Sequence, residues 1–251
     1  MKIVGIIPVR LESSRLPEKA LADIEGLPMI VHTFKRTEIS DALDEVYVAT
    51  DSVVIKDIIE KHGGKVIMTG THHKTGSDRI AEAAQQIDAD IIVNVQGDEP
   101  LLDPEHVSQA VEPLIKDPSI QIAVLVTPYK KKNSSSDIKA VLDLQNNILY
   151  CSRTDLPSNA RTKVDVLWKM SFVVPFRKEF LLKYNSWEQT PLEKIEFNEY
   201  LRILEHGYKI RAVPVDHAHI SVDTPEDLVE VKESMKSDII KRKYNNSGVR
   251  V

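Results

Sequence analysis

The first half of the chain alternates short apolar runs with segments whose apolar residues recur every three or four positions. A continuous apolar run predicts a strand buried on both faces, and the longer spacing predicts a helix with one buried side. Strands are expected at 2–9, 45–50, 65–69, 90–95 and 120–127. Helices are expected at 28–39, from 51 or 52 to 63–64, from 77 or 78, and from 103–104. Repeated strand–helix units predict an α/β fold: an open, mostly parallel sheet with helices on both faces.

The pattern changes after about residue 130. Two short runs flank Gln145-Asn146-Asn147, which predicts a hairpin. Further strands are expected at 167–175 and 208–215, a loop at 154–165 and helices at 190–207 and after Thr224-Pro225. The tail after about residue 237 loses its periodicity, so we expect it to be frayed. These features predict one domain over 1–251, with an inserted β-containing segment at about 130–210.

Composition narrows the class of protein. The 251 residues carry a net charge of −5, and 42% of them are hydrophobic, as in an ordinary globular protein. No apolar run approaches the ~18 residues of a membrane span, and the first residues lack a signal-peptide cleavage pattern. The acidic balance argues against a nucleic-acid partner. A single cysteine, Cys151, excludes a disulfide framework, so we expect a reduced, cytoplasmic protein without a membrane partner.

Candidate chemistry begins in the segment after the first strand. Ligands of open α/β sheets bind at the carboxyl ends of strands, and residues 10–19 carry two arginines, a lysine and two serines. Guanidinium and ammonium groups suit phosphate oxygens. Glu12 and Glu18 offset part of this charge, so composition alone is equally typical of a solvated loop; the position after a strand favours a phosphate site. The chain contains neither GxxxxGK[ST] nor GxGxxG.

The segment IIPVRLESSRLPEKALADIEGLPMIVH resembles the N-terminal signature of the 3-deoxy-manno-octulosonate (Kdo) cytidylyltransferases. The likeness continues through most of the chain, in VYVATDS, KTGSDRIAEA, IIVNVQGDEPLLDP, KAVLDLQNNILYCSR, PLEKIEFNEYLRILEHGYKI and VDTPEDL. It implies a nucleotide-diphospho-sugar-transferase-like fold and a homodimer formed by the inserted segment. It also implies transfer of CMP from CTP to the anomeric hydroxyl of an acidic sugar, with release of pyrophosphate, in a pathway to lipopolysaccharide.

The same resemblance implies which residues act. CTP would be bound by Arg10, Ser13, Ser14, Arg15, Lys19, Thr50, Asp51, Thr75, Gly76, Ser77, Arg79 and Gln96. The catalytic residues among these would be Arg10, Arg15 and Lys19, together with Asp98. The acceptor sugar would contact Gln96, Arg153, Glu199 and Tyr200. Arg79 has a plainer alternative as a surface i,i+4 partner on its own helix.

Two aspartates are the expected metal ligands. Asp98 lies in QGDEP at a strand end, and Asp223 begins DTPEDL. Paired carboxylates suit Mg²⁺, which prefers one or two carboxylates plus phosphate oxygens. Asp223 could instead cap the following helix. The pairs His72-His73 and His217/His219 lack a third ligand at suitable spacing, so we expect them to be structural, and we expect Cys151 to be a small core residue.

One segment departs from the family pattern. Where relatives have the strand H-[LV]-G-[IV]-Y, this chain has Met170 and Val174 in place of the histidine and the tyrosine. Tyr200 also replaces a family glutamine. The acceptor could therefore be Kdo, an amino-Kdo, another ulosonic acid or a phosphonate, since lost hydrogen bonds alter substrate choice. A glycosyltransferase and a non-catalytic nucleotide-binding protein are the other classes. Trp168, Trp187 and Tyr184 would be dimer anchors or core residues.

Overall fold

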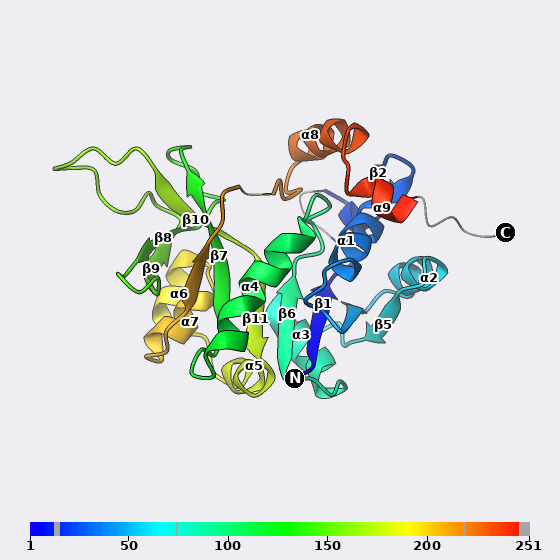
Figure 1. The fold of residues 1–251 in the computed structure, drawn as a ribbon, viewed down its shortest axis with the longest axis horizontal. Helices are drawn as coiled ribbons and strands as arrows, with labels where there is room; N and C mark the ends of the chain where they lie inside the picture. The colour runs from blue at the N-terminus through cyan, green and yellow to red at the C-terminus, as the bar shows by residue number, and fades with distance from the viewer. Residues whose placement is uncertain (13–15, 74, 218, 246–251) are drawn as a thin grey trace. The chain divides into compact units, whose positions relative to one another are not determined.

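The structure, a computed structural model, describes residues 1–12, 16–73, 75–217 and 219–245 (Figure 1). Its contacts divide the chain into two compact units. The first comprises Met1–Ser108 and His219–Val251, and the second comprises Gln109–Ala218. The second unit contains the segment that the sequence predicts as an insertion. The assignment of the whole chain to one domain stays a prediction.

A parallel sheet forms the centre of the first unit. Its strands run in the order β6 (Ile91–Val95), β1 (Ile3–Pro8), β4 (Glu45–Thr50) and β5 (Lys65–Met68), and each neighbouring pair is parallel. Every residue of β1 and β6 is buried. A strand with no exposed residue is covered on both faces, as the continuous apolar runs predict. The predicted parallel α/β fold is confirmed.

Helices pack on this sheet through one apolar side each. α1 (Met29–Glu38) contacts β4, α2 (Val53–Lys61) contacts β4 and β5, and α3 (Gly76–Gln85) contacts β1, β4 and β6. Ser52 caps α2 by accepting a hydrogen bond from the Ile55 amide at 3.4 Å. α3 begins slightly earlier than predicted, because Thr75 and Asp78 form a capping box around its first turn.

The chain ends of the first unit differ from the predictions. The segment after residue 18 forms a 3-10 turn, η1 (Lys19–Leu21), and a small hairpin of β2 (Asp23–Ile24) and β3 (Leu27–Pro28). α8 (Pro225–Lys236) begins at Thr224 as predicted. The prediction of a frayed tail is wrong for α9 (Lys241–Asn245), because Tyr244 is buried on α1. Residues 246–251 lie outside the described residues.

The second unit has its own five-stranded sheet. Its order is β12 (Arg211–Pro214), β7 (Ala123–Tyr129), β10 (Leu167–Ser171), β8 (Lys139–Leu142) and β9 (Ile148–Ser152). Only the β12–β7 pair is parallel. β8 and β9 form the predicted hairpin, and Asn146 adopts a positive φ of 59° in its turn. α4 (Pro104–Lys116) begins in the first unit and continues into the second.

Three elements of the second unit escape the sequence pattern. The segment predicted as one strand at 167–175 forms two strands. β10 ends at Ser171, and β11 (Val173–Arg177) begins two residues later. α5 (Lys178–Asn185) was not predicted. The helix predicted at 190–207 is two short helices, α6 (Pro191–Glu196) and α7 (Tyr200–Glu205). Phe197 takes a left-handed φ of 49° between them, and no glycine or proline signals that break. No helix in the described ranges has the length and apolarity needed to cross a bilayer.

Candidate active site

A cavity of about 280 Å³ opens in the first unit where β1 and β6 end. This is the edge of the sheet at which the sequence places the nucleotide. The residues that line it come from six separate segments of the chain. They are Pro8, Val9, Arg10, Glu12, Lys19, Ala20, Met29, His73, Thr75, Gly76, Arg79, Gln96, Gly97, Asp98 and Asp223.

Lys19 joins the two predicted metal ligands. Its ammonium nitrogen Nζ donates to Asp98 Oδ2 at 2.6 Å and to the Val222 carbonyl at 2.8 Å, and it lies 4.0 Å from Asp223 Oδ1. The Val222 amide also donates to the Asp98 carbonyl at 3.0 Å. The backbone therefore ties the two aspartate-bearing segments together. Three residues far apart in the sequence form one charged cluster that lines the cavity.

The capping alternative for Asp223 is not what the structure contains. Asp227 accepts hydrogen bonds from the amides of Asp223 and Thr224, at 2.9 and 2.7 Å, and Thr224 Oγ1 accepts from the Asp227 amide. The cap of α8 is therefore built from Thr224 and Asp227. The Asp223 carboxylate lies on the cavity side, near Lys19.

Glycine allows the backbone to approach closely at the base of the cavity. A β-carbon at Gly97 would lie 3.2 Å from the Pro8 carbonyl oxygen, tighter than most such contacts. At Gly76 the same atom would lie 3.4 Å from the Pro8 ring and 3.8 Å from Gln96 Nε2. The absence of a side chain at Gly97 therefore lets the end of β6 lie against the end of β1. Both glycines line the cavity, and Gly76 is one of the residues predicted to bind the nucleotide.

Arg79 is buried and held by two partners. Its guanidinium donates to Asp51 Oδ2 at 2.8 Å and to Thr69 Oγ1 at 2.5 Å, and the residue is 5% exposed. The alternative of an i,i+4 surface partner is therefore wrong. Arg79 lines the cavity with its donors fixed by the ends of β4 and β5. Thr69, which sequence reasoning missed, directly follows a strand, and that position is the signal that could have identified it.

The other predicted nucleotide residues fall into two groups. Arg10, Gln96 and Thr75 line the cavity, although the Thr75 hydroxyl also caps α3 by accepting from the Asp78 amide. Thr50 and Ser77 are fully buried and are not among the described residues that line it. Asp51 is also set back from the wall and acts through Arg79. Ser13, Ser14 and Arg15 lie outside the described residues.

Arg153 of the second unit is hydrogen-bonded to several backbone carbonyl groups. Its guanidinium donates to the backbone carbonyls of Ser135, Ser136, Glu196 and Phe197 at 2.8–3.2 Å. These four carbonyls occupy four of the five N–H donors of an arginine. Arg153 therefore links the end of β9 to the break between α6 and α7.

The residues that depart from the family pattern lie in the interior of the second unit. Met170 and Val174 are 0% exposed, on β10 and β11. Tyr200 is 3% exposed, and its ring stacks on Phe172 with centroids 5.9 Å apart. Glu199 is half-buried, and its carbonyl accepts from the Tyr184 hydroxyl at 3.2 Å. Met170, Val174 and Tyr200 are therefore buried apolar or aromatic residues at positions where the family pattern has hydrogen-bonding side chains.

Aromatic side chains pack together in the second unit. Tyr184 is 1% exposed, and Trp187 packs edge-on against it at 6.1 Å and stacks on His206 at 4.0 Å. Tyr184 is therefore a core residue of this unit, whereas Trp187 is partly exposed and packs on that core. A role of Trp168 and Trp187 as dimer anchors stays a prediction. Cys151 is also fully buried, as predicted, and burial raises the pKa of its thiol to about 12.

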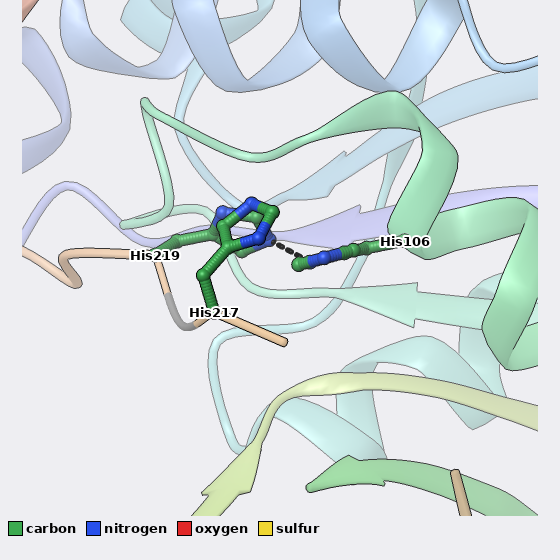
Figure 2. A group of neighbouring side chains, drawn as sticks. All are labelled: His106, His217 and His219. Atoms are coloured by element: carbon green, nitrogen blue, oxygen red, sulfur yellow. Dashed lines mark hydrogen bonds between the residues drawn. The ribbon is translucent and has the colours of Figure 1, made fainter. Parts of the chain in front are cut away.

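The histidine pairs differ from each other. His106 Nδ1 and His219 Nε2 are 2.7 Å apart, and both residues are buried (Figure 2). The Asp103 amide also points at His219 Nε2, at 3.4 Å. His219 Nε2 is then the acceptor and His106 Nδ1 the donor. The structural role expected for the His217/His219 pair stays a prediction. The His72-His73 pair lies close to the carboxylate of Glu82, which follows His73 by nine positions in the sequence.

Comparison with known proteins gives the family. The sequence model described as Cytidylyltransferase matches residues 4–210. The 3-deoxy-manno-octulosonate cytidylyltransferase of Geobacter metallireducens is 43% identical over 250 residues, covering 94% of this chain and 98% of the relative. The namesake from Chlorobium limicola is 40% identical over 242 residues, covering 94% and 98%. This chain belongs to the 3-deoxy-manno-octulosonate cytidylyltransferase family.

A solved structure supports the family fold. A CMP:2-keto-3-deoxy-manno-octonic acid synthetase complexed with CTP matches with a TM-score of 0.90 and 34% identity, over 94% of this chain and 99% of that one. A 4-diphosphocytidyl-2C-methyl-D-erythritol synthase from Anaerococcus prevotii has a TM-score of 0.63 at 15% identity, which is a likeness of fold alone. The chain is thus a cytidylyltransferase with the fold that its strand–helix pattern predicts.

Proposed function

We propose that this cytidylyltransferase transfers CMP from CTP to the anomeric hydroxyl of Kdo or a close relative and releases pyrophosphate. The observation that carries the proposal is the Lys19–Asp98–Asp223 cluster, which lines the same cavity as the nucleotide motifs. Relatives that match this chain over nearly their whole length are named 3-deoxy-manno-octulosonate cytidylyltransferases.

The cavity supplies positioning and charge rather than a covalent nucleophile. The sugar hydroxyl forms a bond to the α-phosphorus as the bond to the β-phosphate oxygen breaks, so negative charge grows on the departing pyrophosphate. Lys19 and Arg10 offer the cationic donors that offset this charge. Gly76 and Gly97 let the backbone lie close to the nucleotide. Arg79, fixed by Asp51 and Thr69, keeps a rigid wall beside it.

The donor set of the cavity fits Mg²⁺. Asp98 and Asp223 both approach the one ammonium of Lys19, and both side chains keep partial exposure, at 27% and 38%. Two accessible carboxylates next to a phosphate-binding segment are the hard ligands that Mg²⁺ prefers. Mg²⁺ held there would neutralise phosphate charge and lower the pKa of the attacking hydroxyl. Asp98 and Asp223 are the residues that we assign to it.

Transfer to a different acidic acceptor is the second candidate. It is favoured by Met170 and Val174, which are buried and apolar where the family pattern has a histidine and a tyrosine. A site that has lost two hydrogen-bonding groups no longer rejects analogues that lack the matching hydroxyl. An amino-Kdo, another ulosonic acid and a phosphonate are the acceptors to compare with Kdo.

We further propose that the active form is a homodimer built through the second unit. Ile195 and Phe197 are 72% and 83% exposed on and directly after α6, beside the partly exposed Leu192. Large apolar side chains grouped on one short segment are typical of an interface, and a second copy of the chain is the partner that the family implies.

The test of the reaction is pyrophosphate release with CTP, Mg²⁺ and a panel of acidic sugars. We expect turnover with Kdo or one of its relatives and none without an acceptor. Asp98→Ala is expected to abolish turnover, whereas Asp103→Ala, a nearby carboxylate that does not line the cavity, retains it. If CTP binds in calorimetry but no sugar releases pyrophosphate, the protein is a non-catalytic nucleotide binder.

A further inference from the structure

His72, His73 and Glu82 form a second polar cluster in the first unit. One ligand atom from each, two imidazole nitrogens and a carboxylate oxygen, lie within 4.8 Å of one another. The sequence offers no third ligand close to the histidine pair, and the fold provides one from α3. The two imidazole rings converge with centroids 4.4 Å apart, although adjacent residues in an extended chain point in opposite directions.

The cluster is built around Glu82. His73 Nε2 is hydrogen-bonded to Glu82 Oε2, and the Gly70 amide donates to both oxygens of the same carboxylate at 3.1 and 3.2 Å. The His73 side chain is 8% exposed. These hydrogen bonds therefore hold the Glu82 carboxylate in place beside the two imidazole rings.

Gly70 makes room for the third member. A β-carbon at position 70 would lie 2.5 Å from both Nδ1 and Cε1 of His72, which is closer than real atoms approach. Any side chain at this position would push the His72 ring out of the cluster. The close packing of His72 over this glycine is the reason that both imidazoles reach Glu82.

We propose that His72, His73 and Glu82 bind a zinc-like transition-metal ion. Two imidazoles and one carboxylate are a donor set that Zn²⁺ accepts, with water in the fourth position. Donor atoms around tetrahedral Zn²⁺ lie about 3.4 Å apart for bonds of about 2.0–2.1 Å, so small side-chain rotations from the present positions complete the site. His73 binds as the tautomer that carries its hydrogen on Nδ1, which frees Nε2 for the ion.

Bound Zn²⁺ would join the segment after β5 to α3. Gly70, His72 and His73 belong to that segment, and Glu82 lies on the second turn of the helix. Because His73 also lines the cavity, the ion would hold one wall of it in place. The site is distinct from the Asp98–Asp223 pair in both position and ligand chemistry, since hard carboxylates suit Mg²⁺ and imidazoles suit Zn²⁺.

The test is equilibrium dialysis of Zn²⁺ against the full chain at neutral pH, in excess Mg²⁺ so that hard oxygen sites are saturated. Wild-type protein is expected to bind one Zn²⁺ more tightly than His72→Gln by about tenfold or more, a loss at least as large as that of an outer-shell partner. Gly70→Ala keeps all three ligands but displaces the His72 ring, so it should weaken binding too. His62→Gln, at the C-terminal cap of α2, is the matched histidine control.

A melting experiment gives an independent readout. Zn²⁺ at a hundredfold excess over its dissociation constant should raise the Tm of the wild type by about 5 °C or more, and should not raise that of His72→Gln. Equal Zn²⁺ affinity in wild type, His72→Gln and Gly70→Ala would overturn the proposal, as would loss of binding in His62→Gln alone. Neither measurement uses CTP or turnover, so its outcome is separate from that of the proposed reaction.

Discussion

Single residues of the cavity are defined by their partners more than by their type. Lys19 is one of 33 Lys and Arg residues, and its ammonium contacts Asp98 and the Val222 carbonyl beside Asp223. Asp51, predicted to touch the nucleotide, instead holds Arg79. The sequence motifs therefore identify residues that lie in or near the cavity. Their contacts decide whether a residue lines the cavity or holds a residue that does.

Lys19→Ala tests the central residue of the cluster. We expect kcat/KM for CTP to fall about 10²–10³-fold, because one preorganised cationic donor to the phosphates is lost. Pyrophosphate release measures this change. Lys35→Ala is the control, since Lys35 pairs with Glu38 on α1 at 2.9 Å and is not among the described residues that line the cavity. Equal losses in the two variants would contradict the assignment of Lys19.

His32 makes stability depend on pH. Its Nε2 donates to the Ile24 carbonyl, and its Nδ1 is hydrogen-bonded to the Tyr244 hydroxyl, both at 2.7 Å. Burial lowers the pKa of His32, outweighing the bond to Ile24. Below pH ~6.5 the unfolded chain therefore binds a proton at His32 that the folded chain does not bind. The stability that is present above pH ~6.5 is lost as the pH falls.

We expect the free energy of unfolding to decrease below pH ~6.5 with a contribution from His32 of up to about 1.4 kcal/mol per pH unit. Urea unfolding at several pH values measures it. His32→Gln should reduce the slope, even if its stability at pH 7 is lower. An unchanged slope in this variant would show that other groups produce the dependence.

Whole elements explain where the pattern succeeds and fails. β1 and β6 are buried on both faces, so their runs are continuously apolar and easily identified. α6 and α7 together resemble one helix in sequence because the break at Phe197 uses a phenylalanine with positive φ. α9 lacks a periodic apolar side, yet one residue, Tyr244, anchors it to His32. Local patterns predict helices that are long and periodic, while short ones depend on their tertiary partners.

The α6–α7 pair depends on one buried ion pair. Arg202 Nε donates to Glu193 Oε2 at 2.7 Å, and both residues are less than 5% exposed. Burial opposes the charge of Arg202, but the bond to Glu193 prevails and raises its pKa. Glu193→Ala leaves a buried arginine without its partner and removes the capping box of α6, so we expect a loss of about 3–5 kcal/mol.

Thermal unfolding measures this loss as a fall in Tm of about 10 °C for a chain of this size. The matched control is Glu188→Ala, an exposed glutamate in the same segment, for which we expect a change within about 0.5 kcal/mol. A Glu193→Ala variant as stable as this control would mean that the ion pair contributes little to the second unit.

At the scale of the whole molecule, the proposed homodimer is tested by measuring the association state of the protein in solution. Ile195→Asp puts a charge where a partner would cover an apolar side chain, so we expect light scattering to report monomers for this variant and dimers for the wild type. Val229→Asp, at a similarly exposed valine of α8, should remain dimeric. A wild type that is monomeric at all concentrations would contradict the proposal.

By itself, the sequence determined the parallel α/β fold, the family and the motifs that surround the cavity. It could do so because buried strands, helix caps and nucleotide-binding loops each leave a local signature in residue type and spacing. In the first unit, most strands and helices therefore lie where the apolar runs and helical spacings predict them.

Only the tertiary structure decided which side chains meet. It brought Asp223 to Lys19 across 204 positions while Asp227 took the capping role, and it paired Arg79 with Thr69 and Asp51. It also set Glu82 beside two histidines through the space left by Gly70. Such contacts depend on the packing of elements distant in sequence, and local spacing carries no record of that packing.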